Sequence, residues 1–261
     1  MILPDLVKQM EPLVRSAGQA IMGYFRHDFQ QREKSLGDFV TAADLASQEI
    51  LIAGLTKLLP QARIISEELA NLQTLQIDHP AEYCWVIDPL DGTNNFRRGI
   101  PHFAISIALV QSQKTVLGVI YDPVCQDFFY AISGQGVYYN HQRVTVKSDN
   151  LNNSDHPDNI FHNRLITTNI KDIYLLNLEL EGVLLRKFGS AALDLAYAAM
   201  GWIDLVAYQG LYHWDFAAGE LLVLEAQKAF HQVHLPHSWG GQQQILAGSA
   251  PLVIQMCRYI N

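Results

Sequence analysis

Two aspartates, Asp88 and Asp91, lie three residues apart directly after an apolar segment. That segment, Trp-Val-Ile at 85–87, is β-prone and predicts a buried strand. Pro89 is expected to end the strand, because proline has no N–H to give to a ladder and keeps the preceding residue extended. Two carboxylates at the end of a strand are suitable ligands for a divalent cation.

The residues that follow this pair suit an anion. Gly92 permits a positive φ or a close approach of the backbone to a ligand, and Thr93 and Asn94 favour the start of a helix. The first N–H groups of such a helix point outward and can receive a phosphate. The arrangement predicts a metal ion that itself holds a phosphate. The alternative is a surface turn with exposed acids, since Asp, Pro and Gly are ordinary turn residues.

Further acidic residues fall at the ends of other expected elements. Asp44 lies in the first turn after a plausible N-cap, Glu67 and Glu68 follow a short strand at 62–66, and Asp215 opens a helix. If the fold brings these acids together with the first pair, they form an all-oxygen cage. Such a cage selects a hard cation such as Mg²⁺ rather than zinc.

Each of these residues also has a simpler explanation. Asp44 would complement the dipole of its own helix, and the adjacent Glu67 and Glu68 would be solvated unless a cation separates their charges. Lys34 lies in the polar segment 30–40, where a lone lysine is usually a solvated surface group.

Composition narrows the class of protein. The chain has 261 residues, of which 49% are hydrophobic and 17% charged, enough for one large domain or two lobes. Its formal net charge of −8 argues against a general nucleic-acid or anionic-membrane surface, so neither partner is expected. The three separated cysteines predict reduced, buried thiols, and the absence of a signal peptide or of ~18 consecutive apolar residues predicts a cytoplasmic protein.

The first half of the chain predicts helices followed by an antiparallel sheet. Helices are expected at 4–26 and from Thr41 to about 59, with a loop or short hairpin at 30–40 between them. Strands are expected at 62–66, 85–87, 103–110, 116–121 and 128–132, and a hairpin pairs 137–138 with 144–146.

The second half alternates between strands and helices, which indicates an α/β lobe. Strands are expected at 165–168, 186–188, 203–208, 229–234 and 244–247, and helices at 173–181, at 191–200 behind the cap Ser190, and from 214 and 251. We therefore expect an N-terminal α+β lobe at 1–150 with most of the metal ligands, and a C-terminal α/β lobe at 151–261 with Asp215.

Several motifs together resemble the inositol monophosphatase family. They are WVIDPLDGTNNF at 85–96 followed by Pro101 and FAISIAL, Ser66-Glu67-Glu68 upstream, and Trp214-Asp215-Phe216-Ala217-Ala218-Gly219 downstream. The resemblance covers nearly the whole chain. It implies a layered αβαβα sandwich and a Mg²⁺-dependent phosphomonoesterase that lithium inhibits, commonly a homodimer.

The resemblance also implies roles for individual residues. Glu67, Asp88 and the carbonyl of Leu90 would hold a first metal, and Asp88, Asp91 and Asp215 a second. Glu68 would help to hold a third metal or its water, so two or three Mg²⁺ ions are expected per site.

The same resemblance implies the catalytic and substrate contacts. Thr93, paired with Asp44, would orient or deprotonate the attacking water, and the N–H groups of Gly92 and Thr93 would receive the phosphate. The alcohol side of the substrate would meet a set of further residues, namely Asn94, Gly189, Ser190, Ala191 and Tyr208, with Lys34 at the mouth of the site.

Two departures from the family pattern bear on the substrate. Tyr208 stands where the inositol enzymes carry a glutamate that contacts sugar hydroxyls, which puts inositol phosphate itself in doubt, and Asn94 replaces a common threonine. His213, just before Trp214, would face the leaving group or lie on the surface. A small phosphorylated alcohol is the expected substrate, such as an inositol, histidinol or sugar phosphate. The alternatives are a fructose bisphosphate or 3′-phosphoadenosine phosphatase, or a regulatory binding protein, non-catalytic or moonlighting, on the same fold.

Overall fold

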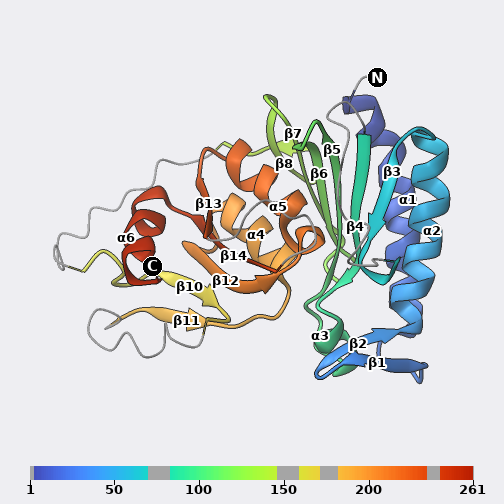
Figure 1. The fold of residues 1–261 in the computed structure, drawn as a ribbon, viewed down its shortest axis with the longest axis horizontal. Helices are drawn as coiled ribbons and strands as arrows, with labels where there is room; N and C mark the ends of the chain where they lie inside the picture. Colours follow the sequence, from blue (N-terminus) through green and yellow to red (C-terminus); the bar gives the residue numbers. More distant parts are fainter. Residues whose placement is uncertain (1–2, 70–82, 146–158, 171–181, 234–241, 261) are drawn as a thin grey trace.

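Helices and sheets alternate in five layers, in the order helix, sheet, helix, sheet, helix (Figure 1). The computed structural model describes residues 3–69, 83–145, 159–170, 182–233 and 242–260. This architecture is the αβαβα sandwich that the sequence predicts. Within the described residues, no helix is long and apolar enough to cross a membrane.

The larger sheet has seven strands in the order β3-β4-β5-β6-β7-β8-β9. Its neighbours are antiparallel, as predicted, except that β3 and β4 run parallel. The strands are β3 (Arg63–Ser66), β4 (Tyr83–Asp91), β5 (Ala104–Gln111), β6 (Lys114–Asp122), β7 (Asp127–Ile132), β8 (Gly136–Tyr139) and β9 (Gln142–Arg143).

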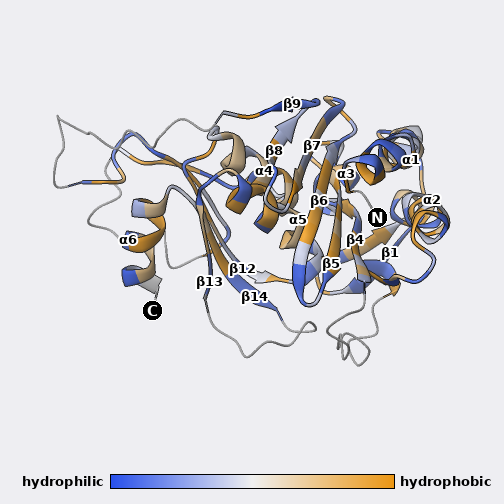
Figure 2. Cartoon of the chain, turned by 90° about the horizontal axis from the view of Figure 1, so that it is seen from above, coloured by the Kyte–Doolittle hydropathy of each residue, from blue (hydrophilic) through white to orange (hydrophobic). Residues whose placement is uncertain are grey.

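Helices α1 (Leu3–Tyr24) and α2 (Ala42–Leu58) cover one face of this sheet, joined by the hairpin of β1 (Gln31–Ser35) and β2 (Asp38–Thr41). Side chains alternate between the two faces of a strand, so Trp85 and Ile87 on β4 pack under these helices, whereas Cys84 and Val86 face the other way. Figure 2 shows apolar residues concentrated along the central strands and the helices beside them.

Helices α4 (Ala191–Met200) and α5 (His213–Glu225) fill the layer between the two sheets. One hydrophobic core joins residues of the larger sheet, both helices and the smaller sheet. Gly118 on β6 lets α5 lie close against the sheet, since a Cβ there would stand 2.7 Å from the carbonyl oxygen of Ala218. Ser106 on β5 donates to the carbonyl of Trp214 at 3.2 Å. These contacts fix the start of α5, where Asp215 lies.

The smaller sheet has the order β11-β10-β12-β14-β13. Its strands are β10 (Leu165–Thr168), β11 (Leu184–Arg186), β12 (Leu205–Leu211), β13 (Ala229–Val233) and β14 (Gln243–Gly248). The final helix α6 (Ala250–Ile260) packs on its outer face through residues such as Leu252 and Met256.

A few predictions about elements need correction or fall outside the described residues. The strand expected at 186–188 lies two residues earlier. Cys84 is buried as predicted, but Cys125 is exposed, and none of the three cysteines forms a disulfide. The expected helix at 173–181 and the expected lobe boundary at 150/151 lie outside the described residues.

Candidate active site

The end of β4 is a buried bulge rather than a surface turn. Pro89 does not end the strand, because pairing with β5 passes from Asp88 opposite Ser106 to Asp91 opposite Ala104. Two residues of β4 thus face one of β5, and proline is tolerated at such a bulge. Asp88 is 1% exposed and Asp91 8%, so the alternative of exposed turn acids is wrong.

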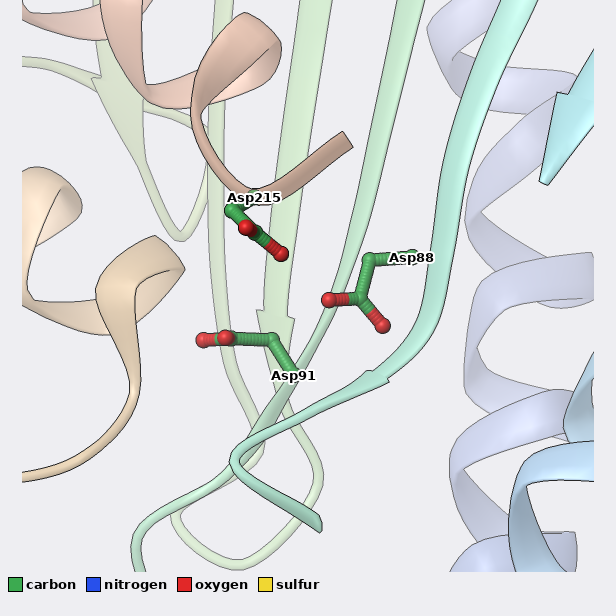
Figure 3. Close-up of side chains that lie close together, drawn as sticks. All are labelled: Asp88, Asp91 and Asp215. Carbon is green, nitrogen blue, oxygen red and sulfur yellow. The ribbon is translucent and has the colours of Figure 1, made fainter. Parts of the chain in front are cut away.

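Asp215 lies close to these two aspartates and comes from α5, in the helical layer between the two sheets. Its Oδ2 accepts a hydrogen bond of 2.7 Å from the N–H of Tyr212, which closes the N-terminal cap of α5. One carboxylate oxygen from each of Asp88, Asp91 and Asp215 lies within 4.8 Å of the others, and Figure 3 shows the three side chains around a common space. Three clustered carboxylates fit a hard divalent cation.

The charges in this cluster are unfavourable without a counter-ion. Burial, followed by the charges of Glu67 and its aspartate neighbours, raises the pKa of Asp88 and of Asp215 well above the usual value. Burial also raises the pKa of Asp91 to about 6, although hydrogen bonds from Ser190 and Ala192 oppose the shift. A divalent cation would remove this repulsion, so the donor set fits the expected metal in charge as well as in atom type.

Lys34 supplies a positive charge at the edge of the cluster. Its Nζ lies 2.7 Å from Glu67 Oε1, 2.8 Å from Glu68 Oε1 and 3.3 Å from Asp38 Oδ1. Lys34 belongs to an exposed strand, but its side chain is 22% exposed and paired with three acids, so the simpler explanation of a lone solvated lysine does not describe it. Burial alone would lower the pKa of Lys34, but the two glutamates outweigh burial and raise it. The glutamate pair thus has the cation that adjacent acids require.

Asp44 is fully buried at the start of α2 and holds two threonines. Its Oδ2 accepts hydrogen bonds from the N–H, at 2.8 Å, and from the hydroxyl of Thr41. Its Oδ1 lies 3.2 Å from Thr93 Oγ1, which is also 3.0 Å from the carbonyl oxygen of Leu90. The structure therefore brings Asp44 and Thr93 together beside a backbone carbonyl that is an expected metal ligand.

Gly92 connects the bulge to the short helix α3 (Thr93–Arg97). Its φ is 89°, a left-handed conformation that favours glycine, and a Cβ there would lie 3.0 Å from the carbonyl oxygen of His102. Asn95 of α3 donates to the carbonyls of His102 and Phe188. The helix start predicted at this point is confirmed.

The residues expected on the alcohol side of the substrate differ in their surroundings. Asn94 is exposed and donates to the carbonyl of Gly37, whereas Ser190 is buried and donates its hydroxyl to Asp91. Tyr208 is 4% exposed, and its hydroxyl bonds to Asp194 and to Thr167 at 2.8 Å. Gly189 and Ala191 flank Ser190, and Ala191 is 7% exposed. Contact of these residues with a substrate stays a prediction.

Several buried residues that frame the site are absent from the sequence predictions. Ser47 of α2 donates to the carbonyl of Pro89 at 2.8 Å and so holds the bulge. His102 Nε2 lies 3.4 Å from Oδ1 of the buried Asp194. These residues can be identified only from their contacts in the folded structure, because a lone serine, histidine or aspartate has no distinguishing sequence pattern.

These features define a phosphatase-like fold with a cluster of three acids whose oxygens could hold a metal ion. The model of the inositol monophosphatase family matches residues 4–255. The chain belongs to the inositol monophosphatase family, which confirms the resemblance seen in the sequence.

Known relatives agree on the fold but differ in name. Nus factor SuhB of Pasteurella multocida is 36% identical over 256 residues, covering 95% of this chain and 92% of that protein. The extragenic suppressor protein suhB of Bartonella henselae has a TM-score of 0.82 at 31% identity, covering 97% of each chain. Inositol monophosphatase from Anabaena has a TM-score of 0.75 at 26% identity, covering 98% of this chain and 96% of that one.

The relatives' names also test the expected function and partners. A Nus factor name favours the regulatory alternative over the catalytic expectation. It also makes the prediction of no nucleic-acid partner wrong. That prediction rested on net charge, which averages over the whole surface and does not describe any one face of it.

The stability of the protein should depend jointly on metal and pH. The acids of the cluster have a higher pKa in the folded state than the value near 4 of an unfolded aspartate, and that of Asp91 is about 6. Without metal, the protonated acids therefore contribute their full stability below pH ~4. This contribution is lost as the pH rises through 6 and above, because the acids then ionise in the folded protein. A metal replaces the protons and restores stability where they are absent.

We expect Mn²⁺, at one fixed concentration equal to about 100 times its dissociation constant at pH 8, to add about 2.7 kcal/mol to the free energy of unfolding at that pH. The unfolding temperature should rise by roughly 5–10 °C at pH 8 and by much less at pH 5. Thermal unfolding in EDTA and in Mn²⁺ at both pH values measures the effect. An equal rise at the two pH values would contradict the raised pKa values of the cluster.

Replacing Lys34 with methionine should strengthen metal binding. The ammonium group donates a hydrogen bond to Glu67, an expected metal ligand, so it competes with a metal for that carboxylate. A hydrogen bond to a charged group is worth about 1.5 kcal/mol, so the Mn²⁺ dissociation constant should fall roughly tenfold. Calorimetric titration measures it, with Arg32→Met on the same exposed strand as the control. Weaker binding by Lys34→Met would show that the lysine assists the metal.

Proposed function

We propose that the protein hydrolyses a small phosphate monoester by in-line attack of water at the acidic cluster. The observation that supports this best is the juxtaposition of three clustered carboxylates with the Asp44–Thr93 pair. The cluster can hold the metal ions that such a reaction uses, and the pair lies where an attacking water needs orientation. Membership of the inositol monophosphatase family supports the same reaction class.

Each part of the site has a role in this proposal. Bound divalent ions would neutralise the phosphate dianion, lower the pKa of a water molecule and stabilise the departing alkoxide. The hydroxyl of Thr93, held by Asp44, would orient the water or pass on its proton. The N–H groups of Gly92 and Thr93 would receive phosphoryl oxygens as negative charge builds up. Mg²⁺ is the expected ion, with two or three per site, and Glu67 and Glu68 would complete its ligands.

A phosphate-release screen tests this proposal. The purified protein is given inositol 1-phosphate, histidinol phosphate, fructose 1,6-bisphosphate and adenosine 3′,5′-bisphosphate, each with Mg²⁺ and with EDTA. We expect Mg²⁺-dependent release from at least one monoester, with inhibition by lithium. Absence of release from every substrate would reject the catalytic proposal.

We infer a second function, that of a regulatory factor in transcription. The observation that favours it is the name Nus factor SuhB carried by relatives that match 86–95% of this chain. This inference has stronger support among named relatives than the catalytic one, and the two are compatible on one chain. The test is binding to RNA polymerase paused on a nascent RNA. Asp91→Asn should bind as the wild type does, whereas failure of the wild type to bind would reject the inference.

The resemblance to the family also implies an oligomeric state. We expect a homodimer, and light scattering coupled to size exclusion would measure its mass. A monomeric mass at micromolar concentration would contradict this expectation.

A further inference from the structure

Ser190, at the start of α4, contacts Asp91, at the end of β4, although 99 residues of sequence separate the two. Its hydroxyl donates to Oδ2 of Asp91, and the N–H of Ala192 donates to the same oxygen at 2.9 Å. Ser190 is fully buried. The Ser190 hydroxyl therefore donates to a neighbouring protein group, while contact of this segment with a substrate stays a prediction.

Two donors on one carboxylate oxygen restrict the orientation of the Asp91 side chain. A single hydrogen bond leaves a carboxylate free to turn about that bond, whereas two donors from different directions fix its plane. Asp91 is one of the three acids whose oxygens lie within 4.8 Å of one another (Figure 3). Any loss of this orientation changes the geometry of the cluster.

A second contact holds the same two segments together. Asn95 Nδ2 donates to the carbonyl oxygen of Phe188 at 2.7 Å, two residues before Ser190. Gly189, between Phe188 and Ser190, has a φ of 90°, and a Cβ there would stand 3.0 Å from Asn95 Nδ2. The chain before α4 thus lies against the residues that follow the bulge of β4, with little room to shift.

We propose that Ser190 is a positioning residue of the metal site, which orients the Asp91 carboxylate toward the cluster. The proposal rests on the proposed function, because it assigns to Asp91 the role of a metal ligand. Ligand carboxylates are commonly held by hydrogen bonds of this kind, and removal of such a partner typically weakens metal binding by 10–100-fold. Ser190 would thereby connect α4, which carries no acid of the cluster, to the metal site.

A purely structural role for Ser190 makes a different prediction. The residue is the N-cap of α4, and its hydroxyl accepts a hydrogen bond of 3.3 Å from the N–H of Leu193. If capping were its only role, its removal would lower stability and leave the metal dissociation constant unchanged. Metal affinity therefore separates the two roles.

The experiment measures Mn²⁺ binding by calorimetry and by electron paramagnetic resonance, together with thermal unfolding in EDTA. Ser190→Ala should weaken Mn²⁺ binding about tenfold or more, and Ser190→Thr, which keeps a hydroxyl, should restore most of the affinity. Ser249→Ala is the matched control, because Ser249 is also buried and directly precedes a helix, α6, which packs on the outer face of the smaller sheet, away from the cluster. It should bind Mn²⁺ as the wild type does.

The outcomes separate this inference from the proposed function. If the wild type binds Mn²⁺ and Ser190→Ala binds it equally well, the positioning role is wrong and the metal site stands. If the wild type binds no Mn²⁺, the metal site and the positioning role both fail. The comparison of Ser190→Ala with Ser249→Ala decides the question even if the added methyl of threonine prevents that variant from folding.

Discussion

The Asp88→Asn variant is expected to lose measurable Mn²⁺ binding and to lose phosphatase activity by roughly 10³-fold or more. Asp88 is one of the three acids of the cluster and is an expected ligand of two metals. Charge stabilisation by a bound metal is worth several kcal/mol in the transition state, and each 1.36 kcal/mol corresponds to tenfold in rate. Calorimetric titration and phosphate release measure the two losses.

The same substitution should stabilise the metal-free protein at pH 8. Burial and neighbouring acids raise the pKa of Asp88, so its ionisation disfavours the fold at high pH, and neutral asparagine removes that cost. At pH 4 and below the aspartate is protonated, and the stabilisation should vanish. Asp127→Asn on β7 is the control and should leave metal binding unchanged. A metal-free Asp88→Asn protein that is less stable than the wild type at pH 8 would refute this account of the cluster.

The Asp44→Asn variant is expected to keep its metals and lose turnover by roughly 10²–10³-fold, in the range typical of a lost general acid–base group. Asp44 is held by Thr41 and lies 3.2 Å from Thr93 Oγ1. An asparagine can keep the Thr41 contacts, but it cannot accept a proton from the water that Thr93 orients. The rate constant under saturating substrate and the Mn²⁺ dissociation constant, measured on the same sample, separate the two effects.

Thr93→Ser is the control for this variant, because it keeps the hydroxyl and should retain most of the activity. Thr93→Ala should reproduce the loss seen in Asp44→Asn, and the double variant should be little worse than either single one, since the two residues act together. Additive losses would show that Asp44 and Thr93 act separately.

Much of the fold follows from local sequence patterns. The apolar, β-prone runs of β5, β6 and β7 and the caps at Thr41 and Ser190 are strong signals, and the structure confirms all of these elements. The bulge at Pro89 was not predictable in this way, because it depends on pairing with β5. A proline that would end an isolated strand is accommodated where one extra residue leaves its nitrogen outside the ladder.

The acids of the candidate site were predictable from the sequence, but the residues that hold them in place were not. Asp88, Asp91 and Asp215 have a recognisable sequence context, and the structure brings them together. The contact of Lys34 with Glu67 and Glu68, and the buried Ser47, Ser106 and Ser190, depend on residues far apart in the chain. No local pattern specifies such contacts, because each is created when separate layers pack together.

The origin of Asp215 in the central helical layer has a consequence for biosynthesis. The bulge of β4 and the hairpin with Lys34 are made early, whereas Asp215 is translated more than a hundred residues after Asp91. The nascent chain therefore carries an incomplete set of acids until α5 has left the ribosome and docked on β6. Lys34 offsets part of the negative charge of Glu67 and Glu68 within residues already synthesised, so the growing polypeptide has a counter-charge of its own before a complete cage exists.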